Sequence, residues 1–384
     1  MARASRETVA PQSEVEELTQ GDNVFEANGT LSEFAITVKE CKKDCNIDGE
    51  DKKITSAMIY GSITEVIKDS AYKFALSALD FSKHQKNGNE GKGFKGIMTV
   101  LGFDYSFDKD KGRVVYTQSG DGLSPKINGT VTFNYLDGTH ETYNYKGSPT
   151  NPDRLNIRGH LGIKEALTKD QSDLRFFNEL DAQWISKSSD EDKCSFVIDG
   201  YVKDIVDEMN SNGGTTGAGI VTLVVPDFFG VKVYDNFRVL SQWDVTNDDG
   251  TIDTLTYADF KNYCKVHGSF KFFGDIDAIK VGSSAPVIKN HFGASSNVRS
   301  GYVRLDWNIK GATPLDKPYK NELIDKALAE YQNVLDTDYD RQLKSYQEAI
   351  AKKNNGGGSE SKRGLGRSNT INRSNESEEE NPFD

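Results

Sequence analysis

Apolar and polar side chains alternate over much of the first 315 residues, and this two-residue period is typical of strands with one buried face. In the first part of the chain the alternation predicts strands over residues 31–39, 57–67, 72–81 and 96–103. Two further alternating runs between residues 126 and 146 flank Asp137-Gly138, a dipeptide typical of hairpin turns. Pro149 and Pro152 then mark a predicted domain boundary near residue 150.

A second block of alternating runs follows this boundary. Its predicted strands cover residues 155–167, 173–187, 194–206, 220–225, 231–240, 269–279 and 301–309. Between residues 256 and 266 the spacing changes, because Tyr257, Phe260 and Cys264 recur at three- and four-residue steps and predict a helix. From residue 194 onward the order is therefore three strands, a helix and two strands. This is the order of an OB-fold, a five-stranded Greek-key barrel that binds oligonucleotides or oligosaccharides.

A weak internal repeat links the two blocks. Residues 58–66 align with residues 197–205, and the alignment places Gly61 opposite Gly200. A barrel strand that takes part in two sheets must bend, and a glycine permits the bend. The match is short, so two interpretations stay open, a single OB-like barrel or two in tandem. In either case the predicted fold class is mainly β, with one or two OB-fold-like five-stranded barrels.

The two ends of the chain have a different composition from the β-rich middle. Apolar residues at three- and four-residue steps predict a helical segment over residues 316–353, interrupted near residues 336–340. The predicted organisation is a disordered N-terminus (1–30), a first β-rich domain (31–150), a second OB-fold domain (151–315), the helical segment (316–353), and a flexible linker with an acidic tail (354–384).

The charge balance limits the kind of nucleic-acid site that the chain can carry. Its net charge is −12, whereas non-specific nucleic-acid binding usually depends on a basic surface. A DNA site would therefore be a local basic patch. No stretch approaches the roughly 20 apolar residues of a membrane span, and the N-terminus lacks the apolar core of a signal peptide. We expect a cytoplasmic protein (in the host cytoplasm, if viral) with no membrane partner.

No residue pattern typical of an enzyme occurs in the sequence. The five histidines lack a metal-ligand spacing, and there is no nucleophile or phosphate-binding motif. Residues 247–253 are similar to a calcium loop, but the register places Val245 and Thr256 where acidic ligands belong. Cys41 and Cys45 lack a second pair of zinc ligands. We therefore predict a non-enzymatic protein without a metal or cofactor.

Single-stranded nucleic acid is bound by aromatic rings that stack on bases and by cations near the phosphates. Residues 83–95 form the most basic patch of the predicted folded region, in a loop between two predicted strands. The predicted DNA-binding residues are Lys83, Lys86, Lys92, Phe94 and Lys95 from this loop, and Lys203, Phe228, Phe229, Lys232, Tyr234 and Lys271 from the second block. The alternative is a solvated loop, with the aromatic side chains in the core.

In one predicted strand of the second block, the aromatic side chains can either lie in the core or face solvent and stack on bases. Phe270 and Phe272 share one face of the predicted strand over residues 269–279, and Lys271 shares the other face with Phe273. One of the two faces belongs to the core. At most half of these aromatic rings can therefore stack on bases.

The C-terminal residues have the features of a protein-binding tail. An acidic run is followed by a proline and a phenylalanine, which can enter a pocket ringed by basic residues. The predicted partner-binding residues are Glu378, Glu379, Glu380, Pro382 and Phe383. A tail that only increases solubility is the alternative.

Several short segments of the second block carry a resemblance to a known family. They are Asp199-Gly200-Tyr201-Val202, Thr216-Gly217-Ala218-Gly219, Pro226-Asp227-Phe228-Phe229-Gly230, Phe272-Phe273-Gly274-Asp275-Ile276 and Gly311-Ala312-Thr313-Pro314. On these segments, residues 196–314 resemble the OB domain of single-stranded-DNA-binding proteins from phages of Gram-positive bacteria. The tail resembles that of bacterial single-stranded-DNA-binding proteins.

The resemblance implies a protein that coats single-stranded DNA during phage DNA replication, recombination or repair. It also implies recruitment of replication and repair proteins through the acidic tail, and it leaves a homo-oligomer open. Two other functions remain as alternatives. One is a non-enzymatic phage structural or assembly protein built from β-barrels, and the other is a carbohydrate-binding module.

Overall fold

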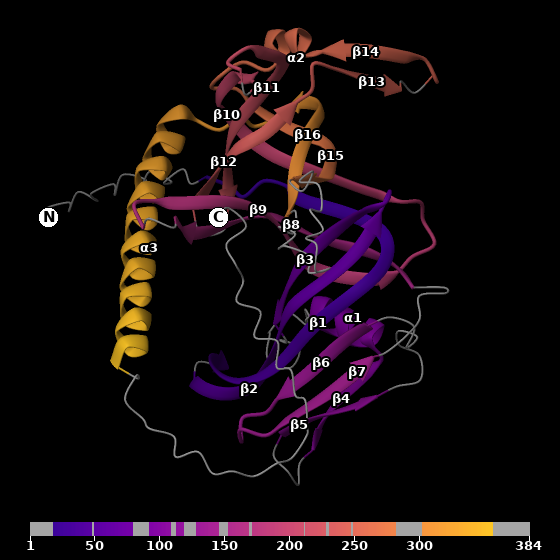
Figure 1. Ribbon diagram of the computed structural model, residues 1–384, viewed down its shortest axis with the longest axis vertical. Coiled ribbons are helices and arrows are strands. Elements are labelled where there is room, and N and C mark those ends of the chain that lie inside the picture. Colours follow the sequence, from indigo (N-terminus) through magenta and orange to yellow (C-terminus); the bar gives the residue numbers. More distant parts are fainter. Residues whose placement is uncertain are drawn as a thin grey trace, which may run out of the picture.

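The computed structural model describes residues 18–47, 50–79, 92–108, 113–118, 128–145, 153–168, 171–210, 212–227, 230–246, 249–281 and 302–355. Two rings of strands dominate this part of the chain (Figure 1). The fold class is mainly β, as the alternation of apolar and polar positions predicts. None of the described helices has the length and apolar character needed to cross a membrane.

The second ring has the strand order of an OB-fold. Its strands are β10 (Lys193–Met209), β11 (Thr215–Asp227), β12 (Gly230–Val239), β15 (Ser269–Val281) and β16 (Tyr302–Pro314). They pair in the circular order β10-β11-β12-β16-β15-β10, with β12 and β16 parallel and all other neighbours antiparallel. Tyr234, Phe237 and Trp307 are buried in the core of the protein.

A short hairpin and a helix connect β12 to β15; the helix agrees with the predicted order, and the hairpin was not predicted. The hairpin is formed by β13 (Gln242–Thr246) and β14 (Ile252–Thr256), and the helix α2 (Tyr257–Tyr263) follows at once. Thr256 and Asp259 cap α2 reciprocally through side chain and backbone, which fixes the start of the helix. Phe260 on α2 is buried in the core.

The first ring closes in the same way, so the tandem interpretation is the one that the strand pairing supports. Its strands are β1 (Asn23–Ile47), β2 (Glu50–Ile67), β3 (Ser70–Leu79), β8 (Arg154–Leu167) and β9 (Leu174–Lys187). The circular order is β1-β2-β3-β9-β8-β1, and only β3 and β9 are parallel. Residues 154–187, which we assigned to the second domain, thus complete the first ring. The prolines near residue 150 precede a strand of the same barrel.

The internal sequence repeat does not correspond to the structural repeat. Gly61 lies on the second strand of its ring, whereas Gly200 lies on the first strand of the other. At Gly61 a glycine is needed, because φ is +143° and a Cβ atom would lie 2.1 Å from the Ala35 carbonyl oxygen. At Gly200 a Cβ atom would lie 3.3 Å from the Leu223 side chain, which is much less restrictive.

A helix and two hairpins are inserted between β3 and β8. They are α1 (Lys92–Leu101), β4 (Phe103–Asp108), β5 (Arg113–Gln118), β6 (Asn128–Asn134) and β7 (His140–Tyr145). The predicted hairpin near residue 137 is confirmed, since β6 pairs with β7 across a turn in which Gly138 has φ +84°. The strand predicted over residues 96–103 is wrong. Phe94, Ile97, Met98 and Leu101 follow helical spacing and are all buried.

The predictions for the ends of the chain are partly wrong. Residues 23–30, predicted to be disordered, begin β1, because the few apolar groups there, such as Phe25 and Ala27, point into the core. Helix α3 (Asn321–Asn355) is continuous across the predicted interruption, where Asp338 pairs with Arg341 one turn away. Ile324 packs the start of α3 against Tyr201 and its buried neighbours on the second ring.

The two rings are joined into one sheet by a single strand pair. The first residues of β1 pair with β10 in register, from Asn23 opposite Ile198 to Asn28 opposite Lys193. Tyr234 adds a buried link, because its hydroxyl group donates a hydrogen bond of 2.8 Å to the Leu161 carbonyl oxygen of the first ring. Figure 1 shows the second ring above the first, with α3 along one side.

Candidate nucleic-acid interface

A cleft of about 360 Å³ lies where β9 of the first ring meets the second ring. One wall is the start of β9, at Phe176, Phe177 and Asn178, and the other wall comes from β10, β11, β12 and β16. The walls are tied together at Asn178. Its amide nitrogen donates to the Leu305 carbonyl oxygen at 2.9 Å, and its amide oxygen accepts from Asn236 at 2.6 Å. We call this site the inter-barrel cleft.

Strand alternation on β11 and β12 explains which side chains reach the inter-barrel cleft. Phe237 and Val239 point into the barrel and are fully buried, whereas Asn236 and Arg238 point outward and line the cleft. Oligonucleotide-binding OB-folds use the face formed by their second and third strands. In this ring those strands are β11 and β12, so the inter-barrel cleft lies on that face.

Two arginine–carboxylate pairs carry the charge of the inter-barrel cleft. Arg238 holds Glu208 with two hydrogen bonds of 2.9 and 2.8 Å, and Arg304 holds Asp306 with two of 2.6 and 2.8 Å. The hydrogen bond from Arg238 is the main cause that holds the pKa of Glu208 below its usual value. Each guanidinium group is thereby fixed in a forked geometry, which also matches a phosphate.

The inter-barrel cleft also exposes apolar surface. Phe176 and Val303 are both exposed and line it from opposite walls. An exposed ring beside two arginines is the combination that single-stranded nucleic acid requires. The balanced charge means that a phosphate must share each guanidinium group with a carboxylate.

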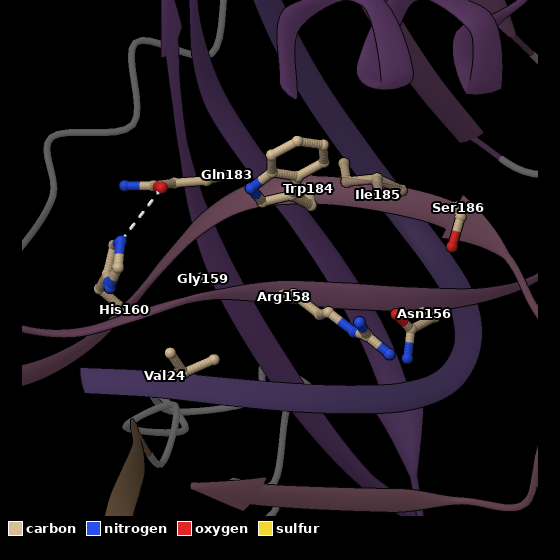
Figure 2. Close-up of a pocket in the computed structure, with 9 residues that line it drawn as sticks. All are labelled: Val24, Asn156, Arg158, Gly159, His160, Gln183, Trp184, Ile185 and Ser186. Carbon is tan, nitrogen blue, oxygen red and sulfur yellow. Dashed lines mark hydrogen bonds between the residues drawn. The ribbon is translucent and has the colours of Figure 1, made fainter. Parts of the chain in front are cut away.

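A second pocket, of about 440 Å³, lies on the outer side of the first ring. Figure 2 shows Gln183, Trp184, Ile185 and Ser186 on β9 and Val24 on β1, with Asn156, Arg158, Gly159 and His160 on β8. The indole of Trp184 is 46% exposed. We call this site the Trp184 pocket.

Hydrogen bonds fix the polar side chains of the Trp184 pocket. His160 contacts Gln183 at 3.1 Å, and its other ring nitrogen contacts the Asn23 carbonyl oxygen. Arg158 donates to Glu26 at 2.9 Å through Nε. Hydrogen bonds to Glu26, the strongest from Lys193, lower its pKa to about 2, so this carboxylate stays charged and keeps Arg158 in place.

Two of the predicted DNA-binding aromatic residues are buried, and these predictions are wrong. Phe94 is 1% exposed because it lies on the core face of α1, and Tyr234 is 0% exposed because it points into the second barrel. Neither ring can stack on a base. For both residues the core position, which the sequence left open as the alternative, is the one observed.

The predicted lysines are dispersed over the surface. Lys95 and Lys203 are exposed on α1 and β10. Lys232 pairs with Asp227 at 3.1 Å, and Lys271 pairs with Asp199 at 3.5 Å and also with Asp22. None of these four lysines lines either pocket.

The remaining predicted site residues are not tested. Lys92 lies in α1 without a described side chain. The predicted residues outside the described part of the chain are Lys83, Lys86, Phe228, Phe229, Glu378, Glu379, Glu380, Pro382 and Phe383. Among the described residues, no group of three or more histidine, cysteine, aspartate or glutamate side chains is placed to hold a metal ion.

Phe176 and Arg304 in the inter-barrel cleft, and Trp184 in its own pocket, were not predicted from the sequence. Phe176 and Trp184 lie in runs where burial of either face is consistent with the sequence. Arg304 follows a stretch outside the described residues, and its place beside β12 depends on the parallel pairing of β12 with β16. Only Arg238, which alternates with the buried Phe237 and Val239, carries a local signal for an outward position.

Comparison with known proteins gives one family. The family model YorF matches residues 140–341, just over half of the chain. The chain belongs to the YorF family. The YorF match contains the whole second ring, both walls of the inter-barrel cleft and the start of α3. No curated protein matches the chain.

Among solved structures, the wild-type single-stranded DNA binding protein from Thermus aquaticus aligns with this YorF chain at 8% identity and a TM-score of 0.32, over 79% of this chain and 97% of the other. A deletion mutant of that Thermus aquaticus protein aligns at 8% identity and a TM-score of 0.29, over 79% of this chain and 98% of the other. Likenesses at these TM-scores support no conclusion about this chain.

Proposed function

We propose that this protein binds single-stranded DNA in the inter-barrel cleft, by base stacking and phosphate contacts and without covalent chemistry. The observation that carries the proposal is the position of Arg238, Arg304 and Phe176. They meet on the face of β11 and β12, which is the oligonucleotide-binding face of an OB-ordered barrel.

The chemistry of the inter-barrel cleft favours a single strand over a duplex. A ring such as Phe176 stacks on any base whose flat face is free, and in a duplex those faces are covered by neighbouring bases. Arg238 and Arg304 would contact phosphates through their forked guanidinium groups. Because the whole chain carries a net charge of −12, we expect weak binding. Because Arg238 and Arg304 contact phosphates, we expect the affinity to fall as the salt concentration rises.

The cellular role follows from stoichiometric binding. A protein of this kind coats DNA that is transiently single-stranded during replication, recombination or repair, in a phage or its host. The acidic tail that includes Phe383 would then recruit replication or repair proteins to the coated strand. The host cytoplasm is the compartment where this role is possible.

The test is a titration of a labelled oligo-dT with the full-length protein at low salt, followed by fluorescence anisotropy. The test variant is the double substitution Arg238→Lys and Arg304→Lys, which keeps both charges and removes both forks. The control is Arg341→Lys, which alters an arginine–aspartate pair on α3 that does not line the inter-barrel cleft. An added oligosaccharide serves as a competitor.

We expect the double variant to bind at least about ten-fold more weakly, since a bidentate contact to an anion contributes roughly 1–3 kcal/mol. The Arg341→Lys variant should bind like the unmodified protein. Absence of binding at micromolar protein would refute the proposal, and so would equal binding by all three proteins. Displacement of the oligo-dT by the oligosaccharide would favour a carbohydrate-binding module instead.

A further inference from the structure

An exposed apolar row crosses the seam between the two barrels. Val24 on β1 lies opposite Val197 on β10, and Val197 lies opposite Phe273 on β15. Residues directly opposite each other on antiparallel strands point to the same face of the sheet. All three side chains are exposed, with Phe273 at 42%. The face that Phe273 shares with Lys271 is thus the outer face, and Phe270 and Phe272 lie on the buried one.

Trp184 extends the same row into the first ring. Trp184 lies opposite Arg158, and Arg158 lies opposite Glu26, which is two residues along β1 from Val24 and therefore on the same face. The Trp184 pocket is thus one end of the row and Phe273 is the other (Figure 2 shows the Trp184 end). We call the row, with Trp184, the seam face.

The seam face is unusual in what it exposes. The chain has three tryptophans, and the other two are buried, Trp243 at 6% and Trp307 at 0% exposure. Phe273 lies over Gly311, where a Cβ atom would come within 2.2 Å of the ring, so a larger residue there would displace the ring from its present position. Exposed apolar patches on a protein surface mark binding sites, and here Arg158 and Glu26 lie between Trp184 and the row of Val24, Val197 and Phe273.

The polar groups around the seam face are suited to a nucleic-acid strand. Asn156 and Gln183 in the Trp184 pocket carry amide groups of the kind that hydrogen-bond to base edges, although the Asn156 amide nitrogen already donates to Glu26 and Asn28, and the Gln183 amide oxygen contacts His160. Arg158, Lys193 and Lys271 lie along the face, each held by a carboxylate of Glu26 or Asp199. The rim supplies cations for phosphates, and the row supplies two aromatic rings for bases.

The separation of the two rings fits a short strand of DNA. Four strand spacings separate β9 from β15, in the order β9-β8-β1-β10-β15, which amounts to about 19 Å. Stacked nucleotides rise about 3.4 Å each, so about six of them span this distance, and fewer if the strand is extended. A single short oligonucleotide can therefore touch both barrels.

We infer that single-stranded DNA crosses the seam face with unpaired bases stacked on Trp184 and Phe273, so that both barrels contact one strand. This inference rests on the proposed function but concerns a surface separate from the inter-barrel cleft. It adds the outer surface at the seam of the two barrels to the DNA-binding surface.

Intrinsic tryptophan fluorescence tests the inference, because Trp184 is the exposed member of the three. Unlabelled oligo-dT of increasing length is titrated into full-length protein, and anisotropy of a labelled oligo-dT gives affinity in parallel. We expect quenching that disappears in Trp184→Phe. Trp184→Ala and Phe273→Ala should each weaken binding at least about five-fold. Tyr346→Ala on α3 removes another exposed aromatic ring as a control, and circular dichroism checks that each variant is folded.

The outcomes separate the inference from the proposed function. Anisotropy that depends on Arg238 and Arg304, with no quenching and no effect of Trp184→Ala or Phe273→Ala, overturns the inference and leaves the proposed function standing. Absence of DNA binding in every assay overturns both. If the two alanine variants turn an oligomer into a monomer without changing DNA affinity, a second copy of the chain covers the seam face and the inference is wrong.

Discussion

Glu65 provides a sharp test of the packing of the first barrel. This residue lies on β2 with 0% exposure, and neither carboxylate oxygen has a hydrogen-bond partner in the described part of the chain. Burial raises its pKa from 4.5 to about 8. The amide nitrogen of Asn28, on the strand shared by the two rings, is also buried without a partner among the described residues. The perturbation is Glu65→Gln, which removes the ionisable group and keeps the shape.

The magnitude follows from proton linkage. Because the folded pKa lies above the unfolded one, the folded chain holds a proton that the unfolded chain releases, and stability is lost as the pH rises from 4.5 to about 8. At pH 7, about 2.5 pH units above the unfolded pKa, the linkage lowers the free energy of unfolding by roughly 3 kcal/mol. The Glu65→Gln variant has no carboxyl group at this position, so its free energy of unfolding is not lowered in this way as the pH rises.

The assay is urea unfolding followed by tryptophan fluorescence, at intervals between pH 4.5 and 9. We expect Glu65→Gln to match the unmodified protein near pH 4.5 and to exceed it by about 3 kcal/mol at pH 7, with no further divergence above pH 8. Glu33→Gln, on the exposed face of β1, is the matched control and should follow the unmodified protein. The reasoning is refuted if the difference between Glu65→Gln and the unmodified protein does not change with pH.

Three further predictions concern DNA affinity and the cores. The logarithm of the affinity for oligo-dT should fall linearly with the logarithm of the salt concentration. The Arg238→Ala variant should make this slope shallower by about one. An unchanged slope would show that Arg238 does not contact a phosphate. Tyr234→Phe, which removes the hydrogen bond to Leu161 that links the rings, should cost roughly 1 kcal/mol of unfolding free energy in urea and leave anisotropy titrations unchanged. Phe94→Ala should cost roughly 3–5 kcal/mol in the same unfolding assay because the ring is buried, whereas a stability change below about 1 kcal/mol would contradict its place in the core.

The sequence predicted helices and strands well where the periodicity of a few neighbouring residues determines the element. The three strands, helix and two strands of the second ring each have their own periodicity, and the capping pair Thr256 and Asp259 marks the start of α2. The prediction of a strand in place of helix α1 was wrong because the run is short. In so few residues, Ile97, Met98 and Val100 fit both the two-residue period of a strand and the 3.6-residue period of a helix.

The extent of the first domain could not be predicted, for a physical reason. Strands β8 and β9 join partners on β1 and β3 that are more than 100 residues away, and local alternation does not identify a partner strand. The candidate site depends on the same long-range pairing. Arg304 and Phe176 meet only because β16 aligns with β12 and β9 extends past its own ring.

The long-range pairing of β1 affects how the chain folds while it is being synthesised. The residues at the start of β1, such as Phe25 and Ala27, pair on one side with β8 and on the other with β10. Neither partner exists until residues 155 to 198 have been synthesised. The start of β1 therefore stays without these partners while more than 100 further residues are added, although the rest of β1 can already pair with β2. Contacts of such long sequence separation slow folding. The first barrel, although it comes first in the sequence, completes its hydrogen bonding only as the second begins to form.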